Sequence, residues 1–236
     1  LHRRRHSFPT RRSSDLLAKL KHLDRIPEPQ RELPQGKTEH ANDRGSRIHD
    51  WAENYVNGTH ATQIPEMREF AVEFEHLRHL FTKGIVSLEG EWGVDKNWEV
   101  TDWKTAWHRS KVDAIVFPDP YSAIVIDYKS GKKFGNEIKH AEQTQLYALN
   151  AVLRYPKIET VTTELWYVDV KDLTSKTFTR EQILRFKPGF DRRGRAMTSA
   201  TEFPPNGNVF SCQWCMYGTR PDGTGSGHCT AGVWRK

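Results

Sequence analysis

The residues best suited to chemistry are concentrated in one stretch, residues 113–129. Two β-branched, apolar runs flank a turn at residues 118–120, Pro-Asp-Pro, and this pattern is typical of a β-hairpin. Antiparallel pairing across the turn would bring Asp113, in the first run, next to Asp127, near the end of the second. Asp127 and Lys129 are two residues apart on a strand, so their side chains would share a face. The stretch predicts two carboxylates and an ammonium at one rim of a sheet.

These three groups are suited to phosphate chemistry assisted by a divalent cation. Converging carboxylates favour a hard, oxygen-seeking ion such as Mg²⁺ or Mn²⁺. A lysine beside such an ion can orient a water or stabilise negative charge developing on a phosphate. Asp113 and Asp127 are therefore candidate metal ligands, and Lys129 is a candidate catalytic residue.

Four sequence elements, in order along the chain, resemble the active site of the PD-(D/E)XK nuclease superfamily. Asp113 and the tripeptide Asp127-Tyr128-Lys129 resemble its central motif. Residues 45–49, Gly-Ser-Arg-Ile-His, resemble the Gly-x-x-x-His helix start of the RecB-like branch, in which the histidine is a metal ligand. Residues 143–147, Gln-Thr-Gln-Leu-Tyr, resemble the Gln-x-x-x-Tyr helix of that branch. The resemblance covers residues 17–229, and four elements in order are more specific than one Asp-x-Lys.

The resemblance implies a fold and an activity. The implied fold class is α/β, with a restriction-endonuclease-like core in which helices flank a mixed central sheet. The implied activity is that of a metal-dependent DNA exonuclease, of the kind carried by phages and related to the CRISPR-adaptation exonucleases. The implied catalytic residues are Asp113, Asp127, Lys129, Gln143 and Tyr147, with His49, Asp113 and Asp127 as ligands of Mg²⁺ or Mn²⁺.

The same resemblance implies the partners and the setting. The expected substrate is DNA, as single strands or duplex ends, and the expected protein partner is a helicase or a single-strand annealing protein. The setting would be phage recombination, repair or DNA processing in the cytoplasm of a bacterial host cell. Exonuclease rather than endonuclease action rests on the resemblance alone.

Two alternative functions stay open. The first is a nuclease-derived DNA-binding or structural module without cleavage, although the presence of every motif residue argues against it. The second is a sequence-specific endonuclease, which would be expected to carry a separate target-recognition region. No segment of this sequence is spare for such a region.

The first 16 residues are expected not to be native protein. Residues 6–16 resemble the in-frame translation of a common sequencing adapter, so we expect one native domain over residues 17–236. A natural basic arm is the alternative. Residues 1–16 contain five Arg and one Asp, so the remaining 31 basic and 29 acidic residues give a net charge of only +2. The basic balance of the whole chain is therefore not a DNA-binding signature. No apolar run reaches transmembrane length.

Hydrophobic periodicity and turn residues predict the elements that would position the site. The sequence also places a capping box at Thr179. A loop or broken helix is expected over residues 190–208. The expected helices span residues 17–23, 45–57, 65–83 and 137–153, and the expected strands outside the hairpin span residues 85–94 and 164–170.

Several side chains near these elements have two interpretations. His49 is either a metal ligand or a capping, half-buried histidine. Glu89 or Glu91 either adds a carboxylate to the metal site or lies on a solvated strand face. Gln143 either holds a phosphate or a water, or is an ordinary surface side chain. The turn at residues 130–133 contacts phosphate or is merely solvated. The aromatic group Trp98, Trp103 and Trp107 either stacks on bases or packs at a hairpin edge, and the second is favoured.

The three cysteines predict a metal clip near the C-terminus, within residues 208–230. Cys212 and Cys215 form a Cys-x-x-Cys knuckle, and Cys229 follows with His228 beside it. Three cysteines cannot all form disulfides with one another, and no feature indicates an oxidising compartment.

Two ligand sets are open for this clip, and absence of any metal is the third possibility. Some RecB-like nucleases hold a [4Fe–4S] cluster with one N-terminal and three C-terminal cysteines. The resemblance therefore implies a cluster on Cys212, Cys215 and Cys229, completed by a cysteine upstream of Leu17. The alternative is a Zn²⁺ site that His228 completes within the chain.

Overall fold

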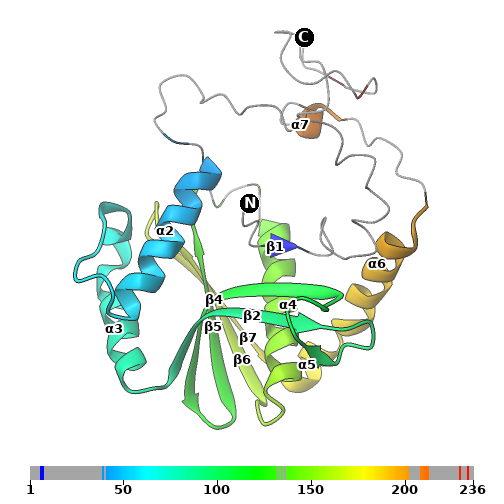
Figure 1. Cartoon of the computed structure of the whole chain (residues 1–236), viewed down its shortest axis with the longest axis horizontal. Helices are drawn as coiled ribbons and strands as arrows, with labels where there is room; N and C mark the ends of the chain where they lie inside the picture. The colour runs from blue at the N-terminus through cyan, green and yellow to red at the C-terminus, as the bar shows by residue number, and fades with distance from the viewer. Residues whose placement is uncertain are drawn as a thin grey trace.

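A mixed β-sheet runs through the middle of the protein (Figure 1). The computed structural model describes residues 6–7, 39, 41–131, 133, 135, 137–201, 208–212, 229 and 233. The strand order is β3-β2-β4-β5-β6-β7. The short strand β1 pairs with the first residues of β4, which precede the part of β4 that pairs with β5. Only the β5–β6 pair is parallel among these described strands. The strands are β1 (His6–Ser7), β2 (Val86–Val94), β3 (Val100–Thr101), β4 (His108–Asp119), β5 (Ser122–Lys129), β6 (Thr160–Tyr167) and β7 (Asp172–Thr179).

Helices cover both faces of this sheet, with α2 and α3 on one side and α4, α5 and α6 on the other (Figure 1). The expected α/β class with a restriction-endonuclease-like core is confirmed. Among the helices of the described residues, none combines the length and the apolar character that a membrane span requires. The helices are α2 (Ala41–Val56), η1 (Pro65–Phe70), α3 (Ala71–Thr82), α4 (Glu137–Arg154), α5 (Arg180–Leu184), α6 (Lys187–Ser199) and α7 (Val209–Cys212).

Two separate hydrophobic cores fix these layers. On the first side, the apolar stripe of α2 and the aromatic residues of α3 pack on Tyr128 and Trp166 of the sheet. On the second side, Leu146, Leu149 and Val152 of α4 are almost fully buried against β4, β5 and β6. Each such side chain contributes roughly 1.5–3 kcal/mol on burial. The sheet and both helical layers therefore form a rigid scaffold for polar groups placed between them.

The hairpin predicted over residues 113–129 is present as β4 and β5. Ala114 pairs with Ile126, so Asp113 and Asp127 stand opposite one another at the next position. The side chain of Tyr128 points to the α2–α3 core, as expected from the alternation of faces along a strand. The register thus brings the two predicted carboxylates together.

The β2–β4 ribbon changes face at Glu89. Val86 packs in the α2–α3 core, whereas Trp92 and Val94 pack in the α4 core. The strand expected over residues 85–94 is therefore present, but its side chains do not alternate regularly between the two faces through its middle. The physical reason is local: Glu89 has a φ of 46°, and a Cβ at Gly90 would lie only 2.6 Å from Trp92 Nε1. A left-handed glutamate costs on the order of 1–3 kcal/mol, and such strain clusters at functional sites.

Three other expectations about the elements need correction. The helix expected over residues 65–83 is a 3-10 turn followed by α3, because Phe70 leaves helical geometry at φ −119° and ψ 26°. The stretch expected to be a loop or broken helix over residues 190–208 is an unbroken helix as far as Ser199, where α6 ends. Gly194 lies inside α6, and its lack of a side chain gives room to the Trp107 ring. The strand expected over residues 164–170 begins at Thr160 and pairs with β7, which is mostly exposed and was not expected.

Other predicted features are confirmed or lie outside the described residues. The predicted helices over residues 45–57 and 137–153 correspond to α2 and α4. The capping box at Thr179 is present, with reciprocal bonds between Thr179 and Gln182. The expected helix over residues 17–23 lies outside the described residues, as do Cys215 and His228 of the predicted metal clip. Cys212 is buried at the end of α7 and Cys229 is half-buried.

A buried histidine gives the fold a predicted sensitivity to acid. His108 Nε2 lies 2.9 Å from Ser110 Oγ and 3.2 Å from Asn150 Nδ2. Burial lowers the pKa of His108 from its ordinary 6.5 to about 4. Below pH 6.5 the unfolded chain therefore takes up a proton that the folded chain cannot. We expect His108 to remove about 2 kcal/mol of stability between pH 7 and pH 5.

Urea denaturation of wild type and His108→Gln at both pH values measures this effect. The glutamine retains hydrogen-bonding groups but does not titrate, so its stability should fall less on acidification. Equal losses in the two proteins would contradict this role of His108.

Candidate metal and phosphate site

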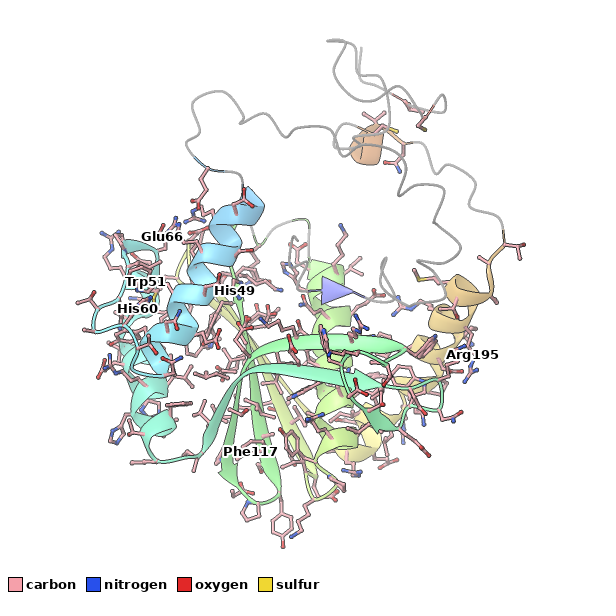
Figure 2. All side chains as sticks on the ribbon, in the orientation of Figure 1. His49, Trp51, His60, Glu66, Phe117 and Arg195 are labelled. Carbon is pink, nitrogen blue, oxygen red and sulfur yellow. The ribbon has the colours of Figure 1, made fainter. Side chains whose placement is uncertain are left out.

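Asp113 is an almost fully enclosed acidic group of the site, with 2% of the residue exposed. Its Oδ1 lies 2.7 Å from His49 Nδ1, and its Oδ2 accepts a hydrogen bond of 2.8 Å from the backbone N–H of Tyr128. Figure 2 shows His49 on the side of α2 that faces the sheet. A histidine–carboxylate contact therefore joins the helix to the hairpin, in addition to the apolar packing between them.

Asp127 and Lys129 form the second part of the site, together with two side chains of α4. Lys129 Nζ lies 2.5 Å from Asp127 Oδ2 and donates a 2.7 Å hydrogen bond to Gln143 Oε1. Gln143 Nε2 donates to Tyr147 Oη at 2.6 Å and lies 3.3 Å from Asp127 Oδ1. The structure thus brings Asp127, Lys129, Gln143 and Tyr147 into one network, as the i, i+4 spacing on the helix and the i, i+2 spacing on the strand predict.

Tyr147 anchors this network to the strand that carries Asp113. Its hydroxyl lies 3.1 Å from the carbonyl oxygen of Lys111 and 3.2 Å from Asp127 Oδ1. Burial, followed by the charges of Asp127 and Asp113, raises the pKa of Tyr147 well above 10. The phenol therefore keeps its proton near neutral pH and acts as a fixed hydrogen-bond donor.

Glu89 supplies a third carboxylate to the site. The sequence left the choice between Glu89 and Glu91 open, and the structure places Glu89 there. Glu89 stands across from Asp113, because the flanking register pairs are Leu88–Ala114 and Gly90–Val112. Its side chain is buried, with 8% exposed, whereas Glu91 is exposed. The bend in β2 thus places one glutamate beside Asp113 and leaves the other in solvent.

Lys111 is a site residue that the sequence did not reveal. Its side chain is 10% exposed and forms an ion pair with the Glu89 carboxylate. The available signal was weak: Lys111 lies two residues before Asp113 on a strand whose other residues are mostly buried. A buried lysine on such a strand requires a carboxylate partner.

The donor atoms fit a divalent metal. One ligand atom from each of His49, Glu89 and Asp113 lies within 4.8 Å of the other two. An imidazole and two carboxylates match the preferences of Mg²⁺ or, with the nitrogen donor, Mn²⁺. Asp127 does not belong to this group of three, although it stands opposite Asp113, and its role as a ligand stays a prediction.

Close packing and an ion pair hold α2 against the end of β5. A Cβ at Gly45 would lie 3.0 Å from Ser130 Oγ, so glycine permits the approach of the helix. Arg44 binds both carboxylate oxygens of Asp169, at 2.9 and 2.6 Å, and lowers the pKa of that carboxyl. Asp169 also accepts a hydrogen bond from the N–H of Gly131. The Gly-x-x-x-His motif is thereby fixed next to Lys129.

The other candidate groups are engaged in contacts of their own. Trp98 and Trp107 are buried, with their rings 5.9 Å apart, which supports the packed hairpin edge and not base stacking. Trp103 lies beneath the guanidinium of Arg109. In the turn after β5, Lys133 Nζ donates to Asp172 at 2.7 Å, so an ion pair engages this lysine.

The fold and the site together define a class of protein. A mixed sheet with helices on both faces carries carboxylates on a central hairpin, a lysine two residues after the second carboxylate, and a histidine from a preceding helix. This arrangement is a restriction-endonuclease-like core.

The family model of the PD-(D/E)XK nuclease superfamily matches residues 12–220, and the chain belongs to this superfamily. Membership implies nuclease activity. The chain is also similar to the crystal structure of SSO0001, with 15% sequence identity over 90% of this chain and 96% of that chain. The TM-score of 0.33 is too low for this likeness to bear on fold or function. No curated protein matches the chain.

Proposed function

We propose that this protein is a metal-dependent exonuclease that hydrolyses phosphodiester bonds of DNA. The observation that supports the proposal most strongly is the convergence of Lys129, Asp127 and Asp113 with the metal-suited set His49, Glu89 and Asp113. The choice of exonuclease, with single strands or duplex ends as substrate, rests on the RecB-like resemblance. A role in phage recombination or repair, beside a helicase or annealing protein, rests on it also.

His49, Glu89 and Asp113 would hold the metal, with Asp127 as a further ligand. Bound there, Mg²⁺ or Mn²⁺ would polarise the scissile phosphate and make water more acidic. The buried position of these groups strengthens their electrostatic effect, because little solvent screens them. His49 and the Tyr128 N–H hold the Asp113 carboxylate from both sides and limit its rotation.

Lys129 is the group that would act on the reacting phosphate. Asp127 and Gln143 hold its ammonium from two directions, so it is oriented before substrate arrives. The ammonium can orient the attacking water or stabilise the charge that develops on the phosphate oxygens. Gln143 and Tyr147 do not need to touch DNA for this role, since they position Lys129 and Asp127.

Tyr147→Phe tests the support that Tyr147 gives to the site. We expect a loss of about 1–3 kcal/mol in the free energy of unfolding, because the Lys111 carbonyl and Asp127 lose a buried donor. We also expect cleavage to slow by about tenfold or more.

Tyr55→Phe is the matched control. The hydroxyl of Tyr55 donates to Glu75, in a contact between α2 and α3. This variant should lose stability but keep its cleavage rate when both proteins are folded. Equal cleavage rates of Tyr147→Phe and Tyr55→Phe would contradict the role of Tyr147.

A cleavage assay on linear and circular single-stranded DNA of the same sequence tests the function itself. Each DNA is incubated with the protein in Mn²⁺, Mg²⁺ or EDTA, and the products are separated by size. The proposal predicts metal-dependent loss of the linear DNA to short products, with circles spared. Cleavage of circles would indicate an endonuclease. No cleavage by a folded protein that binds Mn²⁺ would favour the non-cleaving DNA-binding module.

A further inference from the structure

Lys111 makes a contact that its strand register does not require. The residue directly across from Lys111 on β2 is Glu91, which is exposed. The ammonium of Lys111 instead pairs with Glu89, two residues away along β2, in the interior. Glu89 reaches this position from a left-handed backbone conformation. The pairing therefore depends on the backbone conformation at Glu89 and does not follow from strand alternation.

The backbone of Lys111 is fixed as well as its side chain. Its carbonyl oxygen accepts a hydrogen bond of 3.1 Å from the Tyr147 hydroxyl of α4. Lys111 is thus held by α4 through its main chain and by β2 through its ammonium. Its positive charge stays beside the three potential metal ligands, because Asp113 follows two residues later on the same strand.

The charges of the site explain why a second lysine is useful. Three carboxylates, from Glu89, Asp113 and Asp127, lie close together and are largely removed from water. Lys129 is paired with Asp127 and Lys111 with Glu89. Buried like charges raise the free energy of a folded protein unless counter-charges lie nearby. Lys111 supplies that counter-charge on the Glu89 side.

We propose that Lys111 is a positioning residue that acts as an internal counter-cation: it holds Glu89 in place in the metal-free protein and competes with the divalent metal for that carboxylate. This inference rests on the proposed function, since it assumes a metal at His49, Glu89 and Asp113. The competition weakens metal binding, because a dication that engages Glu89 must displace or repel an ammonium close by. The affinity of the site for metal is therefore set partly by a residue that is not a ligand.

Lys111→Met removes the charge and keeps much of the side-chain length. We expect Mn²⁺, titrated into the metal-free protein by calorimetry, to bind about tenfold or more tightly in this variant than in wild type. The metal-free variant should melt at a lower temperature than wild type, and added Mn²⁺ should raise its melting temperature more. A purely structural lysine predicts the opposite result for affinity, since loss of a supporting contact weakens a metal site.

Three further variants complete the experiment. Lys111→Arg keeps the charge and should bind Mn²⁺ like wild type, within about threefold. Lys176→Met removes a lysine of β7, whose ammonium lies over the Phe178 ring, and controls for the change in net charge. Lys111→Gln can still donate a hydrogen bond to Glu89, and its Mn²⁺ affinity replaces that of Lys111→Met if the latter does not fold.

Unchanged or weaker Mn²⁺ binding by a folded Lys111→Met or Lys111→Gln protein overturns the inference and leaves the proposed function intact. If folded wild type itself binds no Mn²⁺, the proposed metal site fails, and the inference fails with it. Tighter binding in both uncharged variants, with the Arg and Lys176 variants unchanged, supports the counter-cation.

Discussion

Lys129→Ala is expected to slow DNA cleavage by about a thousandfold while the protein stays folded. The ammonium is the one cation of the Asp-x-Lys motif and is oriented by both Asp127 and Gln143. Its loss removes the group that orients water or stabilises charge on the phosphate. Single-turnover cleavage of linear DNA in saturating Mn²⁺ measures the effect, and circular dichroism reports the fold.

Lys133→Ala is the matched control for this prediction. Lys133 follows Lys129 in the same connection but is engaged by Asp172 and lies over the Tyr167 ring. Its replacement should change the cleavage rate by less than about tenfold. Full activity of Lys129→Ala would show that Lys129 is not catalytic, and equal losses in both variants would indicate a general effect of charge.

Asp113→Asn is expected to weaken Mn²⁺ binding by at least about a hundredfold and to abolish cleavage. Asp113 is the carboxylate that the metal-suited group and the central motif share. The amide has nearly the same shape and can still accept the hydrogen bond from the Tyr128 N–H, so we expect the fold to persist. Calorimetric titration of Mn²⁺ into the metal-free protein measures the change in affinity.

Asp119→Asn provides the control, because Asp119 lies on the same strand but is exposed at the hairpin turn. It accepts a 2.7 Å hydrogen bond from the N–H of Tyr121 and belongs to no metal-suited group of the described residues. Wild-type Mn²⁺ affinity is expected for this variant. Unchanged affinity in Asp113→Asn would place the metal elsewhere.

The sequence was sufficient for the parts of the site that depend on local periodicity. Asp127 and Lys129 share a strand face, and Gln143 and Tyr147 share a helix face, because these spacings match the two backbone repeats. The Pro-rich turn fixed the hairpin and therefore the opposition of Asp113 and Asp127. The α/β class was implied by the resemblance to the PD-(D/E)XK nuclease superfamily.

The sequence was not sufficient where a single backbone conformation or a distant contact decides the geometry. Glu89 and Glu91 have the same type and parity on β2, and only the left-handed φ of Glu89 separates them. Lys111 gave only a weak signal, because its partner Glu89 lies on another strand. A loop or broken helix was expected over residues 190–208, whereas α6 continues through Gly194, whose lack of a side chain gives room to the Trp107 ring.

The most direct test of the central claim is to locate the metal in a crystal of the protein soaked in Mn²⁺, by anomalous diffraction. We predict an anomalous peak within coordination distance of Asp113, Glu89 and His49, and loss of that peak in Asp113→Asn crystals. A peak elsewhere, or none at this cluster in crystals of a protein that cleaves DNA with Mn²⁺, would contradict the proposed site.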